Sequence, residues 1–116
     1  MSVVITQGSK PVMSSERLVI DATVGGIALT QSVYQTFDSS LNRGKVTAKQ
    51  AMISVETASI RVSYDPARVP SDSTPAGHIF AIGDIIWLES STQIKNFRAV
   101  RVGGASANIE ATYFGE

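Results

Sequence analysis

The chain of 116 residues contains no cysteine, a single histidine and a single tryptophan. Without cysteine there is no disulfide framework, no thiolate zinc site and no cysteine nucleophile. His78 would have only carboxylates as companions in a zinc site, which is an unusual ligand set for that metal. A Ser-His-Asp mechanism would also depend on His78, and the sequence has no G-x-S-x-G turn to present a serine. We therefore interpret His78 as a structural or surface residue and predict no catalytic residue, metal ion or cofactor.

Charge is also scarce. Ten basic and ten acidic residues cancel, and charged residues make up 17% of the chain, against about 25% in an average domain. A neutral chain lacks the basic surface by which proteins attract nucleic acid. Few charges at zero net charge favour association with other proteins. The predicted partners are therefore proteins, copies of this chain included, and not nucleic acid.

Long apolar runs are missing as well. No run approaches the ~20 residues that span a bilayer, and the N-terminus has no charged leader followed by an apolar core. We expect no membrane contact and a soluble protein that stays where it is made, unless an assembly carries it. The length suits one domain.

The pattern that is present has a period of two, which is typical of strands with one buried face. Its inward positions are Ala51, Ile53, Val55, Ile60, Val62, Tyr64, Ile109, Ala111 and Tyr113. Further strands are predicted over 17–23, 26–30 and 97–103, and turns at 25–26, 38–45, 65–77 and 103–104, the last as a hairpin turn. One helical turn within 32–41 is the best helix candidate. The fold class predicted is all-β, a single antiparallel β-sandwich or jelly-roll-like barrel with an N-terminal arm.

The sequence pattern of residues 1–15 differs from that of the rest, because the strand-like SVVITQ is followed by Gly, Pro and three Ser. We assign 1–15 to an N-terminal arm or edge strand and 16–116 to the β-sandwich domain. The arm either frays as a simple terminus or adds a strand to a neighbouring subunit.

Several polar and aromatic residues have two interpretations. Asp65, Asp72 and Asp84 do not follow the spacing of a calcium loop, and the first and last suit turns. Arg61, Arg98 and Arg101 line up with Lys95 on an exposed sheet face, where they are either solvated or contact an acidic partner. The segment 84–90 is apolar on both faces, so it is either buried twice or meets a partner. Trp87 within it is then a core anchor or an interface residue.

A succession of motifs covers residues 53–114, about half of the chain. It comprises Glu56-Thr57 with Ile60-Arg61, a loop of Pro, Ser and Thr, Gly77-His78, Gly83-Asp84 with Leu88, Phe97 to Arg101, and Ala111 to Phe114. This succession resembles small all-β proteins encoded among the structural genes of tailed bacteriophages, although the loop is longer here. The resemblance implies a non-enzymatic virion component.

The function expected is that of a decoration or cement protein, which binds and stabilises the phage capsid and is localised in the virion. Its partners would be the major capsid protein or other virion proteins, and itself in a homo-oligomer. The alternative is a portal, collar, tail or fibre component, including a receptor- or carbohydrate-binding β-sandwich. An enzyme is the third and least favoured class. The candidate interface residues are Val3, Val4, Ile5, Arg61, Pro66, Arg68, Pro70, Trp87, Arg98 and Arg101.

Overall fold

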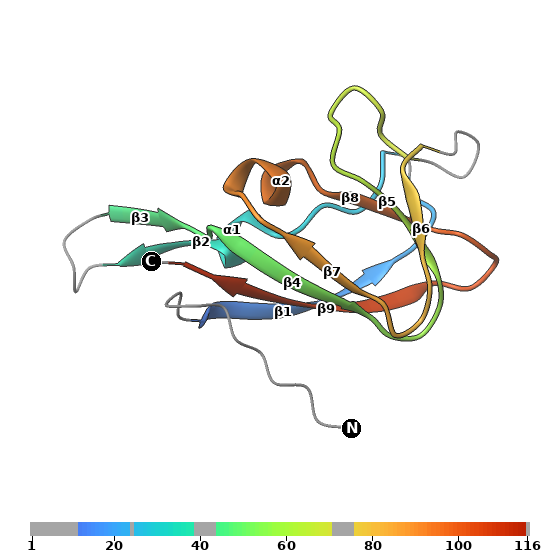
Figure 1. Ribbon diagram of the computed structural model, residues 1–116, viewed down its shortest axis with the longest axis horizontal. Coiled ribbons are helices and arrows are strands. Elements are labelled where there is room, and N and C mark those ends of the chain that lie inside the picture. Colours follow the sequence, from blue (N-terminus) through green and yellow to red (C-terminus); the bar gives the residue numbers. More distant parts are fainter. Residues whose placement is uncertain (1–11, 24, 39–43, 71–75, 116) are drawn as a thin grey trace.

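The computed structural model describes residues 12–23, 25–38, 44–70 and 76–115 (Figure 1). Its strands are β1 (Val12–Ile20), β2 (Gln35–Asp38), β3 (Gly44–Thr47), β4 (Gln50–Val55), β5 (Ile60–Ser63), β6 (His78–Phe80), β7 (Ile85–Leu88), β8 (Arg98–Arg101) and β9 (Ala107–Phe114). Its helices are α1 (Gln31–Tyr34) and α2 (Ser91–Asn96). The main sheets have the orders β1-β9-β4-β7 and β6-β5-β8, all antiparallel. The predicted all-β sandwich is confirmed.

The two main sheets share their strands. The segment 50–63 forms β4 and then β5, and it pairs on one side with 78–88, which forms β6 and β7. On its other side it pairs with 98–114, which forms β8 and β9. Each segment therefore leaves one sheet and enters the other at a common corner, which is visible at the right of Figure 1. Strands that switch sheets by bending are a known way to make such a corner.

Glycine makes the corner possible in the segment 78–88. Gly83 has φ +92°, and its N–H donates to the Val55 carbonyl at 2.8 Å. The Val55 N–H in turn donates to the Asp84 carbonyl at 3.1 Å. The Asp84 carboxylate accepts a hydrogen bond from the Ala81 N–H at 2.7 Å, which confirms Asp84 as a turn residue. The left-handed backbone conformation at Gly83 suits glycine and strains other residues.

The segment that begins with β1 also contacts both main sheets. β1 pairs with β9 along its whole length, and Ile27 beyond it forms a single bridge with Ala99 of β8. The strand predicted over 26–30 is thus reduced to this bridge. β1 begins at Val12, so residues 12–15, which belong to the segment predicted as an arm or edge strand, pair with β9 as part of an edge strand.

The core lies between the two sheets. Of the nine predicted inward side chains, eight are at most 1% exposed, and they join Ile20, Leu29, Ile86, Leu88, Ile94 and Phe97 in one cluster. Tyr64 is the exception, with 42% exposure. The prediction fails there because β5 ends at Ser63 and the chain has already left the sheet.

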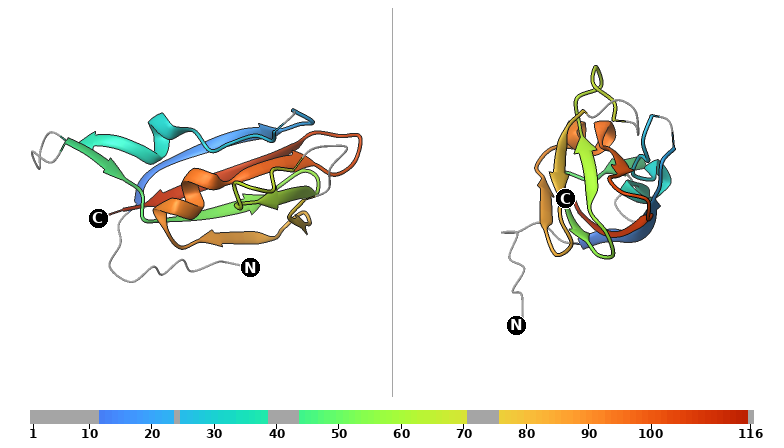
Figure 2. Two further views of the ribbon diagram at one scale, coloured as in Figure 1. Left: turned by 90° about the horizontal axis from the view of Figure 1, so that it is seen from above. Right: turned by 90° about the vertical axis from the view of Figure 1, so that its right-hand side faces the viewer.

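One prediction about a connection is wrong. Residues 103–104 do not make a hairpin, because β8 pairs with β5 and β9 pairs with β1 and β4. The helical turn predicted within 32–41 is present as α1, which ends at Tyr34, and the chain then becomes β2. The β2–β3 hairpin projects from the body in both Figure 1 and Figure 2.

Helix α2 is absent from the sequence predictions. Ser90 accepts a hydrogen bond from the Gln93 N–H at 3.2 Å and so caps its first turn. Its buried side chain is Ile94, and the chain then enters β8 through the buried Phe97. No helix in the described ranges has the length and apolar character to cross a membrane.

Candidate interaction surfaces

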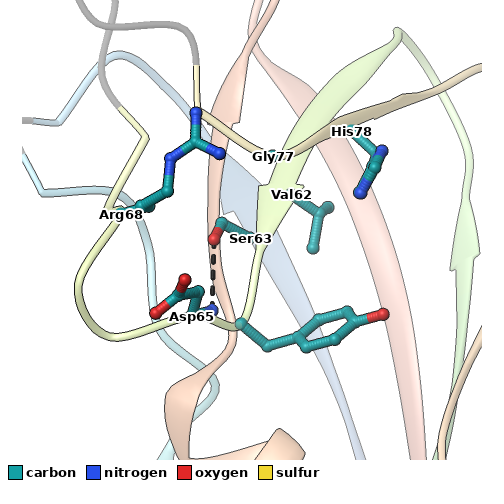
Figure 3. Close-up of a pocket in the computed structure, with 7 residues that line it drawn as sticks. Val62, Ser63, Asp65, Arg68, Gly77 and His78 are labelled. Atoms are coloured by element: carbon teal, nitrogen blue, oxygen red, sulfur yellow. Dashed lines mark hydrogen bonds between the residues drawn. The ribbon is translucent and has the colours of Figure 1, made fainter.

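A pocket of about 180 Å³ lies where the loop after β5 returns to β6. Seven residues from the two ends of that loop and its flanking strands line it: Val62, Ser63, Tyr64, Asp65, Arg68, Gly77 and His78. The pocket thus brings together a hydroxyl, a carboxylate, a guanidinium and an imidazole from within one short stretch of sequence (Figure 3).

These groups are not arranged as a nucleophile and its base. The Ser63 hydroxyl accepts a hydrogen bond from the Asp65 N–H at 3.2 Å. The Asp65 carboxylate accepts one from the Ala67 N–H at 2.9 Å, which is the bonding of a turn residue. Figure 3 shows the His78 imidazole on the other side of Val62 from the Ser63 hydroxyl. Asp65 and Ser63 therefore shape the start of the loop.

No group of three carboxylate or histidine side chains that could hold a metal ion is found in the described part of the chain. Asp65 lies at the start of the loop, whereas Asp84 lies at the corner before β7. Asp72 is outside the described residues.

The predicted row of arginines on one face is wrong. In the β5–β8 register Arg61 opposes Val100 and Arg98 opposes Ser63, but Arg101 opposes the buried Ile60. Because side chains alternate along a strand, Arg101 lies on the opposite face from the other two. All three arginines are half-buried. The Arg98 guanidinium donates to the Phe97 carbonyl at 2.7 Å and to the Lys95 carbonyl at 3.3 Å, so it is engaged within the chain.

Arg101 contributes to a turn after β1. Its N–H donates to the Asp21 carbonyl at 2.9 Å, and its guanidinium donates to the Gly104 carbonyl at 3.4 Å. The pKa of the Asp21 carboxyl is lowered, first by the hydroxyl of Thr23, then by the Thr23 N–H, with a smaller contribution from the charge of Arg101. Asp21 is thereby held as a carboxylate that closes this turn.

The loop residues of the predicted interface separate into two kinds. Pro66 and Arg68 are exposed and accessible to another molecule. Pro70 is almost completely buried, so its assignment to an interface is wrong. Val3, Val4 and Ile5 lie outside the described residues.

Exposed apolar side chains follow the segment 78–88. Ile79 is 53% exposed, Ile82 59%, Ile85 45% and Trp87 39%. This segment is the edge of both main sheets, because β6 and β7 are terminal in their strand orders. Of the two interpretations of 84–90, the structure therefore favours a strand with one buried face and one face accessible to a partner. An exposed apolar strip on a sheet edge is a typical protein-binding surface.

Trp87 points away from the core, so it is not a core anchor. It opposes Met52 on the outer face of the four-stranded sheet, and its ring lies 6.1 Å from that of Phe114, centroid to centroid. Phe114 is only 3% exposed and gives the indole a fixed support. Tryptophan on such a support is a frequent anchor of protein interfaces.

The outer face also carries charged side chains, on β1, on β9 and just after β4. Arg17 on β1 forms ion pairs with Glu56 at 2.5 Å and with Glu110 at 3.6 Å. All three side chains are partly exposed, so these pairs contribute little to stability. These ion pairs place charged side chains on the same outer face as the apolar strip.

A partly buried polar pair, Glu16 and Tyr113, is absent from the sequence predictions. The hydroxyl of Tyr113, on β9, donates to Glu16 Oε2 at 2.5 Å, and the Thr30 N–H donates to the same oxygen at 3.0 Å. Tyr113 is fully buried and its ring packs against Tyr34, with centroids 5.9 Å apart. The sequence pattern could have indicated this pair, because Glu16 lies two and four residues before the inward Leu18 and Ile20 and so shares their face of the strand.

We expect this pair to make the fold sensitive to alkali. Burial, followed by the hydrogen bond to Glu16, raises the pKa of Tyr113 above its ordinary value. The folded protein then holds a proton that the unfolded chain releases near pH 10, so the free energy of unfolding falls as pH rises above that value. Tyr113→Phe should lose ~1.5–3 kcal/mol at neutral pH, because it removes a hydrogen bond to a charged group.

Urea denaturation followed by circular dichroism at several pH values tests this expectation. The decline above pH 10 should be shallower in Tyr113→Phe than in the unsubstituted protein. Tyr64→Phe is the matched control, because Tyr64 is exposed. An equal alkaline decline in all three proteins would contradict the assignment.

Comparison of the chain with protein-family models, curated proteins and solved structures finds no match.

Proposed function

We propose that the protein is a non-enzymatic structural component of a tailed-bacteriophage virion that binds the capsid as a decoration or cement protein. The observation that carries the proposal is the exposed apolar edge along 78–88, where Ile79, Ile82, Ile85 and Trp87 are accessible. Burying such side chains against another protein is favourable by ~25 cal/mol per Å². The binding of many copies to a shell multiplies a modest single contact.

The motifs behind the phage resemblance lie mainly at positions that build the fold. Gly77 and Gly83 have positive φ, and Phe97 and Tyr113 are fully buried. The resemblance therefore supports a shared architecture, while the surface residues carry the case for protein binding. The major capsid protein is the proposed partner, and the virion, assembled in the host cytoplasm, is the proposed location.

The alternative is a portal, collar, tail or fibre component. A carbohydrate-binding version would be supported by aromatic side chains gathered on one face. Among the described side chains the exposed large aromatics are Tyr64 and Trp87. Trp87 lies in β7 of the four-stranded sheet, whereas Tyr64 lies in the loop that follows β5 of the other sheet. This separation favours protein binding over sugar stacking.

The position of the chain in a particle distinguishes these proposals. Purified virions from the phage that encodes the chain would be labelled with a gold-conjugated antibody against it and imaged. We expect label over the capsid surface. Label confined to the collar, tail or fibres would support the alternative, and purified particles without the chain would refute both.

We predict that deletion of residues 2–11 leaves a folded domain that binds capsids more weakly. The fold should survive because β1 begins at Val12. Binding should weaken if the SVVITQ segment adds a strand to a neighbour. The measurement is co-sedimentation of the variant with particles that lack the protein, and the control replaces only Ser9 and Lys10 with alanine. Equal binding by the deletion variant and the unsubstituted protein would contradict the arm hypothesis.

A further inference from the structure

In the described ranges, strand β7 is hydrogen-bonded to another strand on one side only, the side that faces β4. It is the last strand of the order β1-β9-β4-β7, and within the described ranges no strand pairs with it opposite β4. The Val55 N–H donates to the Asp84 carbonyl, which fixes the phase of the β4–β7 ladder. Because this direction alternates along an antiparallel strand, the backbone groups of Ile86 and Leu88 face β4 and those of Ile85 and Trp87 face outward.

The edge also lacks the usual protection against pairing. Natural edge strands are blunted by lysine, proline or bulges. The sequence from Ile85 to Leu88 is Ile-Ile-Trp-Leu and contains neither charge nor proline. Its register with β4 is regular from Ser54 to Ala51, so β7 carries no bulge in that ladder. An unprotected apolar edge is a template for another strand.

We propose that β7 of a second copy of this chain occupies this edge, antiparallel and related by a two-fold axis at Ile86. In that register Ile85 opposes the partner subunit's Trp87, and Trp87 opposes the partner's Ile85. Both pairs combine outward backbone groups, so the edge forms four hydrogen bonds. Both pairs also lie on the outer face, where an aromatic and a β-branched side chain make a favourable cross-strand pair.

The flanking residues select this register over its neighbours. A two-fold axis at Trp87 would pair Ile85 with the partner's Glu89, whose N–H would then leave its bond to its own Gln93 Oε1 at 2.7 Å. An axis at Ile85 would place Trp87 opposite the partner's Gly83, which lies in the corner at φ +92° and is bonded to Val55. With the axis at Ile86, Asp84 opposes the partner's Leu88 and no two acidic residues meet.

The same symmetry favours a second copy over an unrelated protein. The edge is self-complementary, since Ile85 meets the partner's Trp87, Ile86 meets the partner's Ile86, and no charge is left opposite a like charge. The contact buries less surface than a standard interface, which buries ~1,600 Å². We therefore expect a dimer that dissociates on dilution. This inference does not depend on a role in a virion. It assigns Ile85 and Trp87 to the contact between copies, so Ile79 and Ile82 are the part of the apolar edge left for a capsid.

Sedimentation equilibrium of the full chain tests the proposal. We expect reversible dimers, and we expect Ile85→Lys/Trp87→Lys to raise the dimer dissociation constant at least about tenfold, because lysines then oppose lysines in both pairs. Both side chains are well exposed, so the variant should stay folded, which circular dichroism checks. The matched control is Val12→Lys/Val19→Lys, at 64% and 58% exposure on the opposite edge strand, and it should dimerise normally.

A monomer at all concentrations up to about 1 mM, or equal dimerisation of the two lysine variants, would overturn the proposal. Deletion of residues 2–11 should leave the dimer intact. A dimer lost on that deletion would identify the N-terminal segment as the occupant of the edge and would also overturn it.

Cysteine cross-linking tests the register, because the chain has no cysteine of its own. Residues opposed in a hydrogen-bonded pair have Cα atoms ~5.5 Å apart, within disulfide range. An oxidised mixture of Ile85→Cys and Trp87→Cys should therefore yield heterodimers. Each variant alone should cross-link far less, since its cysteines lie two residues out of register. Equal yields in the mixture and the single variants would refute the axis at Ile86.

Discussion

Gly77→Ala is expected to destabilise the domain by about 3 kcal/mol or more, because strain at a special φ and a backbone collision act together. Gly77 has φ +93°, and a Cβ there would lie 2.0 Å from the Val62 carbonyl oxygen and 2.6 Å from the Val62 carbonyl carbon. Those atoms belong to β5, in the middle of the three-stranded sheet, so they cannot move aside without breaking the ladder to β6 or β8. The loss is a large share of the ~5–15 kcal/mol that stabilises a domain of this kind.

Two other glycines separate the collision from the strain. Gly83 has nearly the same φ, +92°, but open space around its Cβ position, so Gly83→Ala should cost only ~1–2 kcal/mol. Gly104 has open space and no left-handed φ, so Gly104→Ala should change stability by less than ~0.5 kcal/mol. The measurement is urea denaturation of the three variants. Equal losses for Gly77→Ala and Gly83→Ala would show that the collision contributes nothing.

Phe97→Ala is expected to cost ~3–5 kcal/mol, because a fully buried aromatic side chain would leave a cavity. Phe97 is 0% exposed and ends α2, so its ring joins the helix to the cluster between the sheets. The midpoint of urea denaturation should fall accordingly.

Two further substitutions serve as comparisons for the loss expected from Phe97→Ala. Phe97→Leu keeps most of the volume and should lose less than Phe97→Ala. Val102→Ala removes an apolar side chain that is 42% exposed, so it should lose less than ~0.5 kcal/mol. If Phe97→Ala cost no more than Val102→Ala, Phe97 would not be the link between α2 and the core.

The candidate surface was predictable only in part. The sequence singled out Trp87 and the exposed loop residues Pro66 and Arg68, but it also placed Pro70 and a row of arginines on the surface. Pro70 is buried, and Arg101 faces away from Arg61 and Arg98. The spacing of three residues between Arg98 and Arg101 already puts them on opposite faces of one strand, whereas the burial of Pro70 is decided by tertiary packing.

Strand positions and their inward residues follow from the sequence itself, because a period of two assigns alternate side chains to opposite faces. Ile53, Ile109 and Tyr113 are buried as that period predicts. The sharing of strands between sheets was decided by long-range pairing, as was the contact of Glu16 with Tyr113, 97 residues further along. The apolar segment around Trp87 illustrates the division most clearly. Its sequence says that both faces are apolar, and only its place as the last strand of the sheet determines that one of them is open to a partner.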